Sequence, residues 1–267
     1  MKLGLSSFTY GWAVGLRDHE PAQPMDENGL LDQVHEHGLK LLQIGDNLPF
    51  RAFTMDRLKA LGARAKSEGI EIEIGARALT PQSLAMHATI AQMIGAKLIR
   101  FVVDGNDYHP SAEAIVQTIK LTLSCLNGLA LGLENHDRFK ASEFRQIIDA
   151  VDAPNVGVCL DTANSLGAGE GLETIVEALG PVTFNLHIKD FEVKRLPHLM
   201  GFTVTGCPAG TGLVNVPWLL KKLQEFGRCE TAILEQWTTP EPELEKTISK
   251  ENAWATQSLD YLKPFFT

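Results

Sequence analysis

Short apolar runs alternate with amphipathic stretches along the whole chain. Eight runs have the length and composition of buried β-strands, at residues 2–8, 39–45, 70–76, 98–103, 129–134, 156–161, 182–188 and 231–237. Between the runs, apolar residues recur with the three- and four-residue spacing of a helix that buries one face. This alternation predicts βα units assembled around a parallel sheet.

The intervening stretches carry ordinary helix boundary signals. Thr80 and Pro81 suit the N-cap and first turn of one helix, and Gly38 and Gly69 suit the ends of two others. Helices are predicted over residues 29–38, 55–69, 80–95, 110–127, 141–151, 171–179, 216–227 and 243–263. Eight strands alternating with eight helices predict an α/β fold, a (β/α)8 TIM barrel in which residues 1–267 form one domain.

An open, doubly wound sheet uses a similar alternation of strands and helices. The polar residues that follow the apolar runs favour the closed barrel. The runs at 131–134, 156–161, 184–188 and 232–235 each end near one potential metal ligand, and these are Glu134, Asp161, His187 and Glu235. In a parallel barrel the carboxyl ends of the strands converge on one mouth, so the four side chains are expected to meet there.

Several unpaired ionisable groups in a low-dielectric mouth would be costly, and a divalent cation would neutralise the carboxylates. Three carboxylates and one imidazole form a hard ligand set that favours Mn²⁺ or Mg²⁺, with Co²⁺ or Zn²⁺ also compatible. The alternative is that these strand-end residues pair among themselves.

Side-chain alternation adds further candidates to the mouth. His136 shares a strand face with Glu134, and Lys189 shares one with His187. Lys189 is a candidate for holding a substrate carboxylate or an enolate, or alternatively pairs with Glu134 or Asp190. Arg77 ends the third strand and would clamp an anionic group, or alternatively pairs with Asp104.

Two other features of the predicted mouth are less specific. Gln43, Asp46 and Asn47 end the second strand and are candidates for contacting substrate hydroxyls. The longest segment without a clear pattern is 191–215. Long loops in compact domains are commonly functional, so this segment is predicted to be an irregular lid over the mouth.

The composition limits the kinds of partner that this chain is expected to bind. The net charge is −9 over 267 residues, which disfavours nucleic acid as a partner. The N-terminus has no secretory pattern, no uncharged run is long enough to span a membrane, and the four cysteines form no CxxC pair. A cytoplasmic protein with reduced thiols and no membrane contact is the expectation.

The motifs LENHD, CLDTAN, LHIKDF, GTGLVNVPWLL and LEQW resemble those of the xylose isomerase-like TIM-barrel superfamily, the sugar phosphate isomerase/epimerase group. The resemblance implies that Glu134, Asp161, His187 and Glu235 bind one divalent metal, most often Mn²⁺. It also implies that Glu134 and Glu235 act as catalytic acid and base on opposite faces of the substrate carbon. His136 resembles the histidine of an E-x-H motif that reaches substrate in dehydratase-type members.

One position departs from the epimerase pattern. Asn164 stands where epimerases of this superfamily commonly carry a histidine three residues after the Asp161 position. Asn164 is therefore a candidate substrate-binding residue, and the epimerase mechanism is less strongly indicated. The type IV endonucleases are disfavoured because this chain lacks that histidine, is acidic and shows no basic stripe.

The resemblance implies a metal-dependent isomerase or epimerase that acts on a small keto-sugar or sugar acid through an enediolate. The alternative is a metal-dependent lyase, a decarboxylase or dehydratase, on a 3-oxo sugar acid. A non-catalytic sugar-binding barrel is the third and weakest interpretation. Since relatives are often dimers or tetramers, a homo-oligomer is also expected.

Overall fold

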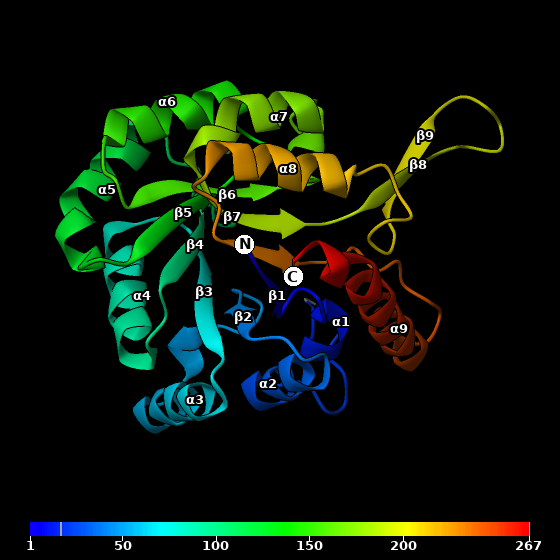
Figure 1. The fold of residues 1–267 in the computed structure, drawn as a ribbon, viewed down its shortest axis with the longest axis horizontal. Helices are drawn as coiled ribbons and strands as arrows, with labels where there is room; N and C mark the ends of the chain where they lie inside the picture. Colours follow the sequence, from blue (N-terminus) through cyan, green and yellow to red (C-terminus); the bar gives the residue numbers. More distant parts are fainter. Residues whose placement is uncertain (17, 267) are drawn as a thin grey trace.

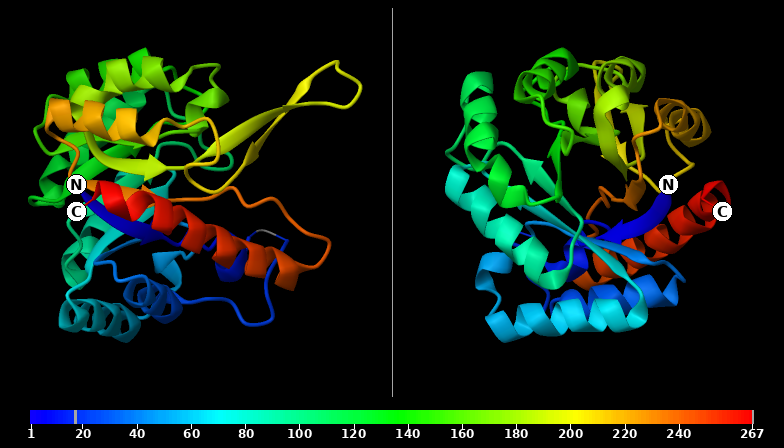
Figure 2. Two further views of the ribbon diagram at one scale, coloured as in Figure 1. Left: turned by 45° about the vertical axis from the view of Figure 1, so that its right-hand side comes forward. Right: turned by 60° about the vertical axis from the view of Figure 1, so that its left-hand side comes forward.

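A computed structural model describes residues 1–16 and 18–266 of the chain. Eight parallel strands close into a barrel in the order β1-β10-β7-β6-β5-β4-β3-β2 (Figures 1 and 2). They are β1 (Lys2–Ser6), β2 (Leu41–Ile44), β3 (Glu71–Arg77), β4 (Leu98–Val102), β5 (Ala130–Glu134), β6 (Val156–Asp161), β7 (Thr183–Ile188) and β10 (Thr231–Leu234). All eight predicted strands are present, so the predicted single-domain (β/α)8 barrel is confirmed.

The helices surround the barrel and also match the predicted stretches. They are α2 (Glu27–Glu36), α3 (Met55–Glu68), α4 (Pro81–Ile94), α5 (Ala112–Leu126), α6 (Ala141–Val151), α7 (Leu172–Leu179), α8 (Val216–Phe226) and α9 (Leu244–Leu262). A short α1 (Gly11–Val14) and the 3₁₀ turns Phe50–Ala52, Asn164–Leu166, Gly180–Val182 and Lys263–Phe265 complete the set. Within the described ranges, no helix combines the length and apolarity that a bilayer crossing requires.

The predicted boundary residues of α3 and α4 act as caps. Thr80 Oγ1 accepts a hydrogen bond from the Ser83 amide at 3.1 Å, and Pro81 occupies the first turn of α4. Gly69 ends α3 with φ of +65°, in the left-handed region that glycine enters without strain.

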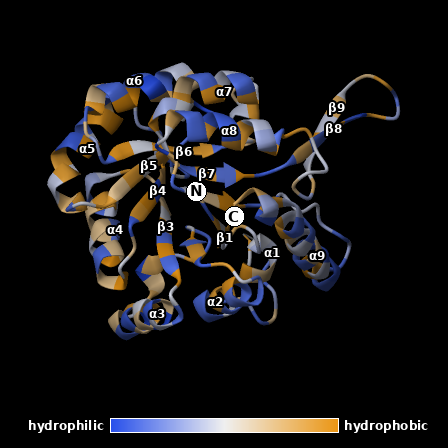
Figure 3. Ribbon diagram, viewed as in Figure 1, coloured by the Kyte–Doolittle hydropathy of each residue, from blue (hydrophilic) through white to orange (hydrophobic). Residues whose placement is uncertain are grey.

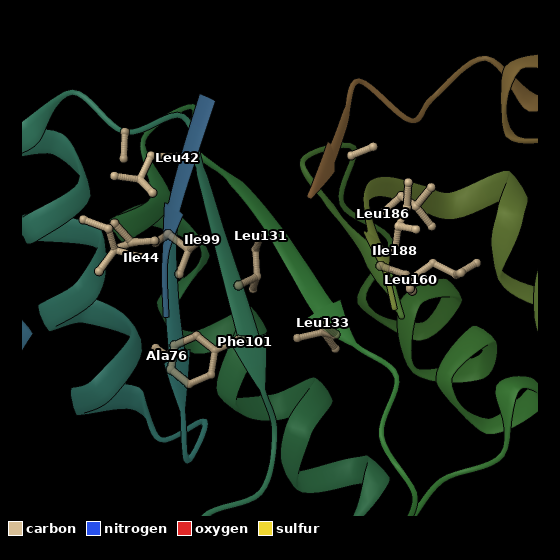
Figure 4. Packing of buried hydrophobic residues seen from close by; sticks show 14 of the residues in the cluster. Leu42, Ile44, Ala76, Ile99, Phe101, Leu131, Leu133, Leu160, Leu186 and Ile188 are labelled. Carbon is tan, nitrogen blue, oxygen red and sulfur yellow. The ribbon is translucent and has the colours of Figure 1, made fainter. Parts of the chain in front are cut away.

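The hydrophobic core lies between the strands and the helices. Figure 4 shows part of it, and its labelled residues are Leu42, Ile44, Ala76, Ile99, Phe101, Leu131, Leu133, Leu160, Leu186 and Ile188. These residues alternate along their strands with residues that face the barrel interior. Figure 3 shows the helices carrying mixed hydrophobic and hydrophilic residues around this layer. The outward strand faces therefore supply the apolar burial that holds the barrel closed.

The barrel interior, by contrast, is largely polar. Gln43 and Glu73, on neighbouring strands, are 0% and 3% exposed, and they hydrogen bond to each other. Arg100 on β4 is 2% exposed and fits because Gly45 and Gly75 flank it. A Cβ atom on these glycines would lie 3.0 and 2.8 Å from the Arg100 guanidinium. TIM barrels are usually filled by bulky branched side chains, so this interior is adapted to a different task.

The segment 191–215 was predicted to be irregular, but part of it forms regular structure. Strands β8 (Phe191–Arg195) and β9 (Phe202–Gly206) pair antiparallel as a hairpin that projects away from the barrel (Figures 1 and 2). Val193 and Val204 face each other across the ribbon and are 42% and 48% exposed. Because the hairpin contributes little to the core, its apolar residues lack the regular burial pattern from which the other strands were predicted.

Asp190 anchors the base of the hairpin. Its carboxylate is buried and accepts hydrogen bonds at 2.9–3.0 Å from four backbone amides, those of Phe191, Gly210, Gly212 and Val214. One side chain therefore fixes the chain on both sides of the hairpin.

Replacing Asp190 by Asn should destabilise the fold, because an amide nitrogen cannot accept the hydrogen bonds that one carboxylate oxygen now receives. Each buried amide left without an acceptor costs about 1–3 kcal/mol. For a chain of this size the loss should lower Tm by roughly 5–15 °C. Differential scanning calorimetry measures the change. Glu192→Gln, in an exposed ion pair of the hairpin, is the control and should change Tm little; equal Tm values for both variants would contradict this role of Asp190.

Candidate metal centre

Four buried side chains at the carboxyl end of the barrel come from consecutive strands of the ring. Glu134 and Asp161 end β5 and β6, His187 is the penultimate residue of β7, and Glu235 follows β10. The strand register places all four on the interior face, because Asp161 pairs with His187 and His187 with Ile233, two residues before Glu235. None is more than 4% exposed.

These side chains converge on one ring nitrogen. His187 Nδ1 lies 3.8 Å from Glu134 Oε1, 3.8 Å from Asp161 Oδ2 and 3.4 Å from Glu235 Oε1. The ligand atoms of Glu134, Asp161 and His187 all lie within 4.8 Å of one another, close enough to share one metal ion. Glu235 adjoins this group through His187.

His187 Nδ1 is buried and makes no hydrogen bond, and the buried Asp161 Oδ2 is contacted by the Lys189 ammonium at 2.9 Å. The other oxygen of Asp161 is fixed by the backbone amides of Ala163 and Asn164, at 2.8 and 2.9 Å. Buried polar atoms without partners are rare in folded proteins and call for an explanation. A divalent cation between the carboxylates and the imidazole would give His187 Nδ1 the partner that it lacks, and the oxygen-rich donor set suits a hard metal.

Two buried cations contact the same cluster. Lys189 Nζ lies 2.9 Å from Asp161 Oδ2 and 3.1 Å from Glu235 Oε2. Arg100 Nε lies 3.2 Å from Glu134 Oε2. Each of the two glutamates therefore has a cationic partner on the side away from His187 Nδ1.

The charges at the mouth shift its pKa values. Burial alone would raise the pKa of Glu235, but His187, Lys189 and Arg100 lower it to about 2. Burial would lower the pKa of Lys189, and the negative charges of Asp161 and Glu235 outweigh that effect and raise it. The pKa of Arg100 is raised in the same way by Glu134 and Asp46 against the effect of burial. All three groups are therefore ionised near neutral pH.

The other predicted site residues lie at the rim. Asn164 Nδ2 donates to Glu134 Oε1 at 2.8 Å. The His136 side chain is 35% exposed and its imidazole pairs with Asp137. Arg77 is 45% exposed, and its Nε lies 2.9 Å from Asp46 Oδ2.

Arg77 and Lys189 form ion pairs, but with other partners than the predicted alternatives. Asp104, predicted to pair with Arg77, instead pairs with Arg138. Lys189 pairs with Asp161 and Glu235 in place of the predicted Glu134 or Asp190. Loop residues such as Asp46 and Arg138 have positions that strand alternation does not determine, so their partners were not predictable from spacing.

Arg100 was not predicted to be part of the site. A charged residue inside the apolar run LIRFV was the available signal, since it cannot face the hydrophobic layer without a partner. Gln43, predicted to contact substrate hydroxyls, is instead fully buried and lies 2.8 Å from His187 Nε2.

Three comparisons with known proteins agree on the fold. A family model described as xylose isomerase-like TIM barrel matches residues 31–265. A 3-oxo-isoapionate decarboxylase from Pectobacterium atrosepticum is 30% identical over 264 residues, covering 98% of this chain and 95% of the relative.

Two solved structures resemble the chain over nearly its whole length. D-psicose 3-epimerase from Clostridium cellulolyticum with D-tagatose is 16% identical, with a TM-score of 0.74 over 98% of this chain and 97% of the other. A xylose isomerase-like TIM-barrel protein from Mycobacterium smegmatis in complex with magnesium is also 16% identical, with a TM-score of 0.70 over the same shares. At this identity the two structures establish the fold.

Replacing His187 by Ala should weaken divalent metal binding, because it removes the nitrogen on which the carboxylates converge. Loss of a partner that only orients a metal ligand already costs about 10–100-fold in affinity, so loss of the ligand itself should cost at least about 100-fold. Isothermal titration calorimetry with Mn²⁺ and elemental analysis after dialysis measure the effect. His35→Ala, on the exposed face of α2, is the control; unchanged Mn²⁺ affinity in His187→Ala would remove His187 from the ligand set.

Proposed function

We propose that this chain, which belongs to the xylose isomerase-like TIM-barrel family, is a divalent-metal-dependent lyase that removes CO2 from a 3-oxo sugar acid. The sequence motifs favour an isomerase or epimerase as the first interpretation and a lyase as the second. The arrangement of charges at the mouth reverses that order.

The observation that carries the proposal is the pairing of both candidate acid/base residues with buried cations. Glu235 lies 3.1 Å from Lys189, and Glu134 lies 3.2 Å from Arg100. A carboxylate beside a positive charge is a weaker base than a free one, because the charge favours its ionised form. Isomerisation and epimerisation both begin with removal of a proton from carbon, a step for which such glutamates are poorly suited.

Decarboxylation of a 3-oxo acid requires no base at carbon. The bond between the carboxyl carbon and its neighbour breaks, CO2 leaves, and the electron pair passes to the ketone oxygen as an enolate. A proton from water then adds to the carbon and the ketone is restored. The catalytic requirement is for positive charge near the ketone oxygen.

The charge balance of the mouth suits an anionic substrate. Three buried carboxylates, Glu134, Asp161 and Glu235, face two buried cations, Arg100 and Lys189, so acidic groups outnumber basic ones by one. A divalent cation would make the occupied mouth positive by one charge. A carboxylate-bearing substrate would be attracted there more strongly than a neutral sugar.

Metal binding is assigned to Glu134, Asp161, His187 and Glu235, with Mn²⁺ as the first expectation and Mg²⁺, Co²⁺ or Zn²⁺ as alternatives. When bound, the metal supplies a Lewis acid for the oxygens of the substrate. The geometry that supports this assignment is the buried His187 Nδ1, which makes no hydrogen bond and on which three carboxylates converge.

Lys189 is the residue we assign to the ketone oxygen. Lys189 is 5% exposed, and its ammonium lies 5.2 Å from the Trp237 ring centroid. A preorganised cation in such a dry site stabilises a developing negative charge more strongly than water does. Arg77 and His136, half-exposed at the rim, are assigned to the rest of the substrate, and Asn164 to holding Glu134.

The similarity to the 3-oxo-isoapionate decarboxylase supports the same choice, because it extends over nearly the full length of both chains. 3-Oxo-isoapionate is therefore the first 3-oxo sugar acid to test. The solved epimerase structures, at much lower identity, support the fold and leave the reaction open.

The Mn²⁺-loaded protein should release CO2 from 3-oxo sugar acids, and in D2O the carbon that loses CO2 should gain one deuterium. Lys189→Met should lower kcat by about 100–1000-fold, the usual effect of removing one group that stabilises a developing oxyanion. Coupled CO2 detection and NMR of the product measure both effects. Lys194→Met, on the exposed hairpin, is the matched control and should retain wild-type turnover.

The isomerase or epimerase reaction predicts a different result in the same assay. Deuterium would enter ketoses at an intact carbon skeleton, no CO2 would appear, and Glu235→Gln would abolish the exchange. That outcome would overturn the decarboxylase proposal and restore Glu134 and Glu235 as the acid and base.

A further inference from the structure

The second ring nitrogen of His187 has a partner beneath the metal centre. His187 Nε2 lies 2.8 Å from Gln43 Oε1, and both side chains are fully buried. An amide oxygen carries no hydrogen, so Nε2 bears the proton and donates it to Gln43. In the neutral imidazole the lone pair then lies on Nδ1, the nitrogen that faces the carboxylates.

The position of the His187 proton depends on the orientation of the Gln43 amide, and the other contacts of Gln43 determine that orientation. Gln43 Nε2 lies 3.0 Å from Glu73 Oε2 and 3.2 Å from Asn185 Oδ1. Glu73 Oε2 accepts this hydrogen bond when the carboxyl group is ionised and also when its proton is on the other oxygen. The NH2 group of Gln43 therefore faces Glu73, and the amide oxygen is left for His187.

The Asn185 amide is fixed independently. Its Nδ2 lies 2.7 Å from Thr231 Oγ1 and 3.1 Å from Glu73 Oε2, which leaves Asn185 Oδ1 to accept from Gln43 and from Cys159 Sγ. Reversing the Gln43 amide would place its oxygen against two other accepting oxygens. In a buried network, where no bulk water can take over a lost hydrogen bond, such a reversal is strongly disfavoured.

We propose that Glu73 and Gln43 are positioning residues that hold His187 in the Nε2–H tautomer, so that Nδ1 is free to bind the metal. This carboxylate–amide–imidazole relay, made of Glu73, Gln43 and His187, rests on the metal centre of the proposed function. Metal-binding histidines commonly donate their other N–H directly to a carboxylate or carbonyl group. Here an amide stands between the carboxylate and the imidazole, and the three residues come from β3, β2 and β7.

The relay explains why the barrel interior is polar below the metal centre. Glu73 accepts hydrogen bonds from Thr231 Oγ1 at 2.7 Å, from Gln43 and from Asn185, and so anchors the whole network. The function of this buried carboxylate is therefore to set the orientation of an amide, which in turn sets the tautomer of His187.

The tautomer is measurable without any metal or substrate. In ¹⁵N-labelled, metal-free protein at about pH 9, well above the ordinary histidine pKa of about 6.5, two-bond ¹H–¹⁵N correlation spectra distinguish the two neutral forms. His187 should be Nε2–H, with its signals assigned by their loss in His187→Gln. An Nδ1–H form in the wild-type protein would overturn the relay, and this measurement needs no variant of Gln43 or Glu73.

Gln43→Met tests the consequence for metal binding. Methionine has a similar length but cannot accept the Nε2–H hydrogen bond, so His187 should shift toward Nδ1–H and donate to the carboxylates. Mn²⁺ affinity, measured by isothermal titration calorimetry on protein with a native circular dichroism spectrum, should fall by about 10–100-fold. Cys159→Ser is the matched control, because it alters a hydrogen bond to Asn185 in the same network and leaves the contact between Gln43 and His187.

The two readouts separate failure of the relay from failure of the metal centre. Unchanged Mn²⁺ affinity in Gln43→Met, with strong binding by the wild type, would overturn the relay and leave the proposed function in place. The wild-type protein could instead show the Nε2–H tautomer and bind no divalent metal. That result would support the effect of the relay on His187 and overturn the metal-dependent function.

Discussion

The structure of this barrel depends on the convergence of three carboxylates on one imidazole nitrogen. Glu134, Asp161 and Glu235 each place an oxygen within 3.8 Å of His187 Nδ1, and all are buried. Mutual repulsion of such groups in a low-dielectric interior would open the mouth unless positive charge is supplied. Arg100 and Lys189 supply part of it from opposite sides, and a divalent cation would supply the rest.

The need for positive charge beside the carboxylates also determines which residues lie in the barrel below the mouth. Arg100 occupies space left by Gly45 and Gly75, so the cation that holds Glu134 depends on two residues without side chains on neighbouring strands. Asp46 lies 3.1 Å from Arg100 and 2.9 Å from Arg77, which continues the alternation of charges out to the rim. The centre is thus surrounded by charged groups of alternating sign, and each stabilises the ionised form of the next.

The strands, the helices and the four metal-binding candidates could be predicted from sequence because each follows from a local rule. Apolar outward faces such as Leu131 and Leu133 identify a strand, and alternation then places Glu134 inside at its end. Arg100 was missed because its partners lie on other strands and in a loop, at positions set by closure of the ring. The hairpin from Phe191 to Gly206 was missed because exposed strands leave no burial pattern, although Val193 and Val204 are suitable strand residues.

The inferred reaction likewise depends on contacts between residues of different strands and loops. Motifs at strand ends identify a candidate metal centre, of a kind that can serve several reactions. They say little about whether its glutamates are free to move protons. The contacts of Lys189 with Asp161 and Glu235 answer that question. Its position just after β7 is equally compatible with pairing to Glu134 or Asp190. A site whose two glutamates are each paired with a cation is better suited to receiving an electron pair from a breaking carbon–carbon bond than to removing a proton from carbon. For this barrel, therefore, the reaction is better inferred from the partners of the two glutamates than from their presence.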